Sequence, residues 1–184
     1  MHFGRLLAVW HNNEQGTPQL SIWDAGRGAQ IWSRELERGA RAEPVGPAEL
    51  ALFEPTRGLF SLLALGDAEP AVAIDRMPLG EFKDVNRIFA LRDAERLLLL
   101  VDTKAKPGLR LRSPPIAVPG GPGSQVVSGA LYAIDLGSAT KLWGPVEIKE
   151  HGLLLSQASG SPLLAFVRNL QTRSGTGMVA DASA

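Results

Sequence analysis

Two segments of the chain, separated by 111 residues, contain the same residue types in the same order. They span residues 20–32 and 131–143 and align without a gap. The positions that we single out are Asp24, Gly26 and Trp32 in the first segment and Asp135, Gly137 and Trp143 in the second. Similarity at a spacing of tens of residues predicts a repeat architecture, in which each repeat is one supersecondary unit and neighbouring repeats bury a continuous core.

Each segment predicts a β-hairpin whose turn follows the aspartate. An aspartate at the end of a strand can accept hydrogen bonds from the amides just after it, and this forms an Asx turn. We expect Gly26 or Gly137 to supply a positive φ, because glycine has no Cβ and adopts this conformation without steric cost. The chain then returns in a second strand, and we expect Trp32 or Trp143 to pack broadly against the neighbouring sheet.

Two further segments fit the same scheme less completely. Residues 71–75 repeat the Ala-Ile-Asp ending of the strand, so we predict a third copy in which Asp75 ends a strand, although no tryptophan follows it. A spacing of about 40–50 residues per blade leaves room for one or two degenerate blades between the clear copies. Residues 152–170 are expected to form the first two strands of a further blade that has no closing pair.

The aspartate, the glycine-containing turn and the tryptophan eight residues after the aspartate resemble a known repeat. The turn between the third and fourth strands of PQQ-like (quinoprotein-type) β-propeller repeats carries the pattern Ala-x-Asp-x-x-Thr-Gly-x-x-x-Trp. The matching residues are Asp24, Gly28 and Trp32 in the first copy and Ala133, Asp135 and Trp143 in the second. Neither copy has the threonine, and the second has Ala139 at the glycine position. Residues 21–24, Ser-Ile-Trp-Asp, are also similar to WD40 repeats, which are our second choice of family.

Residues outside the repeats also predict strands and turns. The 20 glycines and 13 prolines are dispersed between short apolar runs, which is typical of many strands joined by turns. Two stretches could suggest helices, but Pro44 and Pro47 interrupt residues 42–53, and residues 93–100 are a charged turn followed by four leucines. We therefore predict an all-β fold, a partial β-propeller of roughly three to four four-stranded antiparallel blades.

We assign residues 1–170 to the repeat region, with an insertion loop over residues 103–128, and expect residues 171–184 to be a disordered tail. Closed propellers have four to eight blades, so three to four are too few for most rings. An incomplete array leaves strand edges exposed. The chain is therefore expected to be a fragment of a larger propeller protein, or to bind a protein partner or another copy of itself through its open edges.

Composition and spacing argue against several classes of function. The 19 basic residues are balanced by 19 acidic ones, so we expect no nucleic-acid partner, and the apolar runs are too short for a transmembrane segment. The chain has no cysteine, and its three histidines, His2, His11 and His151, are far apart. We therefore expect no catalytic, cofactor-binding or metal-binding residues and no bound cofactor.

The expected function is a non-catalytic interaction or scaffold module. One local charge bias supports a partner with an acidic surface, because a basic stretch concentrates positive potential. Its residues are Lys104, Lys106, Arg110 and Arg112. The alternative is part of a quinoprotein-like propeller enzyme whose catalytic residues lie outside this chain. The N-terminus lacks a secretory signal and by itself indicates the cytoplasm, whereas the PQQ-like resemblance implies the periplasm or cell envelope if the N-terminus is truncated.

Overall fold

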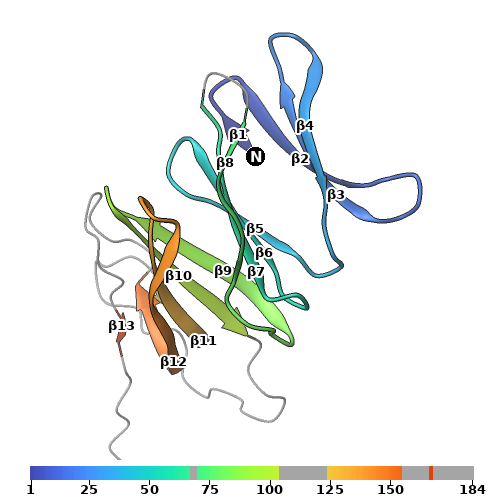
Figure 1. Ribbon diagram of the computed structural model, residues 1–184. Helices are drawn as coiled ribbons and strands as arrows, with labels where there is room; N and C mark the ends of the chain where they lie inside the picture. Colours follow the sequence, from blue (N-terminus) through green and yellow to red (C-terminus); the bar gives the residue numbers. More distant parts are fainter. Residues whose placement is uncertain (67–69, 104–123, 155–165, 168–184) are drawn as a thin grey trace, which may run out of the picture.

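A computed structural model describes residues 1–66, 70–103, 124–154 and 166–167 of the chain. These residues form thirteen β-strands, which are arranged in three antiparallel sheets (Figure 1). The first sheet contains β1 (His2–Phe3), β2 (Leu6–Asn12), β3 (Pro18–Asp24) and β4 (Ala29–Glu35). The second contains β5 (Arg41–Pro44), β6 (Glu49–Glu54), β7 (Leu59–Ala64) and β8 (Ala71–Pro78). The third contains β9 (Val85–Arg92), β10 (Arg96–Thr103), β11 (Ser124–Asp135), β12 (Thr140–Leu154) and β13 (Phe166–Val167).

Within each sheet, strands that follow one another in the chain lie side by side and run antiparallel. One backbone hydrogen bond recurs at the same place in all three sheets and fixes the equivalent positions. The residue that follows the third strand donates its N–H to the carbonyl of the residue that precedes the second strand, at 2.7–3.0 Å; the pairs are Ala25 and Arg5, Leu65 and Ala48, and Leu136 and Glu95. The three sheets are therefore structural repeats of one another.

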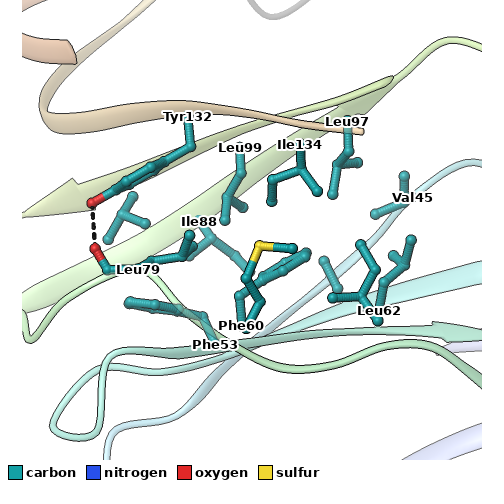
Figure 2. Packing of buried hydrophobic residues seen from close by; sticks show 14 of the residues in the cluster. Val45, Phe53, Phe60, Leu62, Leu79, Ile88, Leu97, Leu99, Tyr132 and Ile134 are labelled. Atoms are coloured by element: carbon teal, nitrogen blue, oxygen red, sulfur yellow. Dashed lines mark hydrogen bonds between the residues drawn. The ribbon is translucent and has the colours of Figure 1, made fainter. Parts of the chain in front are cut away.

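The three sheets are stacked in chain order, with the second between the other two (Figure 1). Alternate residues of a strand point to opposite faces of its sheet, so a central sheet can bury both of its faces. Leu50, Leu52 and Leu63 of the second sheet pack against the first. Phe60 and Leu62, on the opposite face of the second sheet, pack against the third (Figure 2). This succession of stacked, four-stranded antiparallel sheets is a partial β-propeller.

The structure corrects two features of the predicted organisation. Thr103 and residues 124–128, which the prediction placed in an insertion loop at 103–128, are strand residues of β10 and β11. Residues 152–154 continue β12 and pair with β13 in the third sheet; they do not begin another blade. The tail at 171–184 lies outside the described residues.

Two strands were not predicted, for physical reasons that differ. Strand β1 consists of two residues, which is too short for an alternating pattern to be recognised. Strand β5 has the sequence Arg-Ala-Glu-Pro and carries a single apolar aliphatic side chain. It lies at the edge of the second sheet, where a proline that cannot donate a ladder hydrogen bond is tolerated. No helix among the described residues has the length and apolar character needed to cross a membrane.

One buried hydrogen bond joins the connection between the second and third sheets to β11. Tyr132, on β11, is 1% exposed and donates its hydroxyl to the carbonyl of Leu79, at 2.9 Å (Figure 2). Burial raises the pKa of this phenol. Its ring also forms an edge-to-face contact with Phe82, at a centroid distance of 6.5 Å. The segment that follows β8 is thereby fixed against the third sheet.

Replacement of Tyr132 by phenylalanine keeps the ring packing but leaves the Leu79 carbonyl without this donor. We expect Tyr132→Phe to lower the free energy of unfolding by about 1–2 kcal/mol, the usual cost of a buried group that loses its partner. Urea denaturation with an unchanged slope would measure this change. An equal stability of variant and wild type would show that the hydrogen bond does not hold the connection.

Candidate interaction faces

The first predicted aspartate turn is part of the buried structure. Asp24 ends β3 and is 2% exposed. Its Oδ1 accepts hydrogen bonds from the backbone N–H groups of Gly26 (2.9 Å) and Arg27 (3.2 Å). Its Oδ2 forms ion pairs with Arg5 at 3.4 Å and with the Arg27 side chain at 3.6 Å. The carboxylate therefore joins the turn between β3 and β4 to Arg5, the residue that precedes β2.

The equivalent aspartate of the third sheet forms a similar turn at the surface. Asp135 ends β11, and its Oδ1 accepts hydrogen bonds from the hydroxyl and the backbone N–H of Ser138, both at 2.7 Å. These two bonds hold the pKa of Asp135 below its ordinary value. The two repeat aspartates thus use the same local geometry in environments of different burial.

The positive φ of each turn lies two residues beyond the predicted glycine. Neither Gly26 nor Gly137 has a positive φ; the residues that do are Gly28 (63°) and Ala139 (51°). These two positions align with the glycine of the PQQ-like pattern, so the turn geometry is retained where the glycine is not. Ala139 therefore holds a left-handed conformation that costs a residue with a Cβ roughly 1 kcal/mol.

This geometry predicts opposite effects of two exchanges. We expect Ala139→Gly to stabilise the fold by up to about 1 kcal/mol and Gly28→Ala to destabilise it by about 1 kcal/mol. A Cβ at Gly28 meets no atom within 4 Å, so steric contact does not complicate the comparison. Thermal or urea unfolding measures both changes. The same sign for the two variants would contradict the assignment of the strained position.

Asp75 does not end a strand, contrary to the prediction. It lies within β8, the fourth strand of the second sheet, whereas the position equivalent to Asp24 is Ala64, at the end of β7. Asp75 instead pairs with Arg34 of β4, at 2.9 Å, and Arg34 also donates to the hydroxyl of Ser61 at 3.2 Å. Asp75 therefore links two neighbouring sheets and caps no turn.

The different settings of the two aspartates predict different costs of removal. Asp24→Ala leaves two turn amides and two arginines without their carboxylate, and we expect a loss of about 2 kcal/mol in the free energy of unfolding. Asp75 has a side chain that is 58% exposed, so Asp75→Ala should cost less than about 1 kcal/mol. Equal losses in urea denaturation would contradict this distinction.

The two repeat tryptophans also differ in their surroundings. Trp32, on β4, pairs with Ile22 and packs against the core between the first and second sheets. Trp143, on β12, pairs with Ala133 but is 44% exposed. The prediction that the tryptophan packs against a neighbouring sheet is therefore wrong for Trp143. The reason is its place: it lies on the face of the third sheet that points away from the second.

This outer face of the third sheet carries a group of apolar side chains. Phe89 and Leu131 are partly buried on it, next to the buried Leu100, and the same cluster includes Val127, Leu153 and Phe166 of β13. Two of its β12 residues are exposed: Trp143 and Val146, which is 47% exposed and pairs with Leu131. We call this surface the outer face of the third sheet.

One arginine of the third sheet has two buried donor atoms without an acceptor. Arg87, on β9, stacks over the ring of Phe89 at 4.1 Å from its centroid. Its Nε and Nη2 atoms are inaccessible to solvent and have no hydrogen-bond acceptor. Arg41, on the first strand of the second sheet, uses the same two atoms to bind the carbonyls of Asn86 (3.0 Å) and Val85 (2.7 Å) in the third sheet.

The other end of the stack presents a second apolar surface, the outer face of the first sheet. Trp23 is 36% exposed there, beside Leu7 and Val9. Together with Ala25 and other residues they line an open cavity of about 430 Å³. His11 also lines it, and its Nε2 is 2.9 Å from the hydroxyl of the fully buried Ser21.

The structure describes few groups suited to chemistry. No set of three or more His, Asp or Glu residues among the described residues is arranged to hold a metal ion. A second open cavity of about 520 Å³ lies near Phe82, Tyr132, Glu81 and Glu147. Burial raises the pKa of Glu43 more than Arg87 lowers it. Lys104, Lys106, Arg110 and Arg112 lie outside the described residues.

No family model matches the chain, and a search of curated proteins found no match. A search of solved structures found similarity to the β-propeller domain of the Trilobed protease from Pyrococcus furiosus, which is described as having an open velcro topology. The sequences are 16% identical, the TM-score is 0.34, and the match covers 83% of this chain and 47% of that one. The chain thus spans about half the length of that domain. Similarity at this level does not identify a shared function.

Proposed function

We propose that the chain is a non-catalytic interaction module, part of a β-propeller that binds protein through the outer faces of its end sheets. The observation that carries the proposal is the exposure of Trp143, whose equivalent in the first sheet, Trp32, packs against the next sheet. A large aromatic side chain is a common energetic centre of protein interfaces. Its exposure beside other apolar residues marks an interaction surface.

A second exposed apolar side chain supports the same face. Val146, on the same strand as Trp143, is 47% exposed and pairs with Leu131. Under this proposal the PQQ-like or WD40-like resemblance describes the shape of the repeat and assigns no cofactor.

The proposal predicts that a partner contacts position 143 in the cell. We would place the photo-crosslinking residue benzoylphenylalanine at position 143 of the full chain and identify adducts by mass spectrometry. We expect one specific polypeptide to be captured there. Lys83, exposed and outside the two end faces, is the matched control position, and it should give no such adduct.

The identity of the adduct decides between outcomes. A specific protein at position 143 supports the interaction module, whereas adducts that are absent, or equal at positions 143 and 83, contradict it. A separate titration with PQQ, followed by absorbance, tests the enzyme alternative. Saturable PQQ binding would oppose a non-catalytic module.

A further inference from the structure

The outer face of the first sheet has the same residue pattern as two buried faces. These are the faces by which the second and third sheets pack against the sheet before them. The cross-strand pairs at equivalent positions are Leu7–Trp23 in the first sheet, Leu50–Leu63 in the second and Leu97–Ile134 in the third. The second and third of these pairs are buried against the sheet before them. The first pair has the same apolar character, but its Trp23 is 36% exposed because no described sheet precedes it.

The outer face of the third sheet has the complementary pattern. It resembles the faces of the first and second sheets against which the next sheet packs. Three residues on adjacent strands form a row across each sheet at equivalent positions. These rows are Ala8–Ile22–Trp32, Ala51–Leu62–Ile74 and Leu98–Ala133–Trp143. The first two rows contact the next sheet, and Ile74 is 2% exposed. The third row ends in the exposed Trp143.

We infer that a second copy of this chain covers both surfaces. The outer face of the first sheet of each copy docks on the outer face of the third sheet of the other, so that two copies close one ring of six sheets. This inference rests on the proposed function and names its partner. Each new interface repeats the sheet-on-sheet contact that already joins the first sheet to the second and the second to the third.

Two features favour a second copy as the occupant. The chain itself carries the surfaces that fit, with apolar residues at the compared positions of both outer faces. Two copies of the three described sheets give six, within the four to eight blades of closed propellers.

Each contact joins the outer face of the first sheet to the outer face of the third sheet. Because the two faces differ, the interface is heterologous. Such an interface either closes into a ring or continues as an open fibre. A single substitution on either face therefore removes every contact in a pure sample. Two chains that carry substitutions on opposite faces can still form one intact contact with each other. An isologous dimer, which joins like faces, cannot be restored in this way.

Sedimentation analysis of the purified full chain tests these properties. We expect the wild type to reach a limiting dimer as its concentration rises. Trp23→Glu and Trp143→Glu should each weaken association by about tenfold or more, because each places a charge in an apolar interface. An equimolar mixture of the two variants should form a one-to-one heterodimer that neither variant forms alone.

Val72→Glu is the matched control, since Val72 is 38% exposed but lies on the second sheet, and it should associate like the wild type. Circular dichroism checks that each variant is folded. If the tryptophan variants unfold, Val9→Glu and Val146→Glu form a second pair of variants for the same experiment. A monomeric wild type, open polymers, or a mixture that forms no heterodimer overturns the inference. If the chain is monomeric but position 143 is crosslinked to a different protein, the interaction module stands and the second copy is wrong.

Discussion

Apolar contact between the faces of consecutive sheets is the interaction on which the rest of the structure depends. The second sheet is the clearest example, because side chains from both of its faces are buried, including Phe60 on one side and Leu63 on the other. A sheet of this kind is stable only with a neighbour on each side. The first and third sheets have the same two-sided apolar character, yet each has a described neighbour on one side. This asymmetry defines the two candidate interaction faces.

The sequence predicted those parts of the fold that are set locally. The turns at Asp24 and Asp135 follow from the ability of an aspartate to accept hydrogen bonds from the next amides, which needs no distant partner. Continuous apolar runs between turn residues likewise predicted most strands and the all-β class. The same local reasoning failed at Asp75, because Ala-Ile-Asp can end a third strand or lie inside a fourth strand. The pairing of β8 with β7, a tertiary contact, decides between these positions.

Burial at the candidate faces could not be predicted from sequence, for a related reason. Trp32 and Trp143 occupy equivalent positions in the repeat, and the sequence gives no reason to separate them. Their exposure differs because a sheet follows one of them and no described sheet follows the other. The two buried donor atoms of Arg87 could not be predicted either, since an arginine side chain is ordinarily exposed to solvent. A repeat therefore predicts which face a residue occupies, whereas its neighbours determine whether that face is covered.

The strained turn of the third sheet shows that the repeat geometry is maintained by more than its sequence motif. Ala139 occupies the left-handed region that Gly28 occupies in the first sheet, although a Cβ makes this conformation unfavourable. The register between β11 and β12 and the two hydrogen bonds from Ser138 to Asp135 hold the turn in place. This register brings Trp143 opposite Ala133, on the outer face of the sheet. The hairpin thus places its tryptophan as the hairpin of the first sheet places Trp32, although it has an alanine at the glycine position.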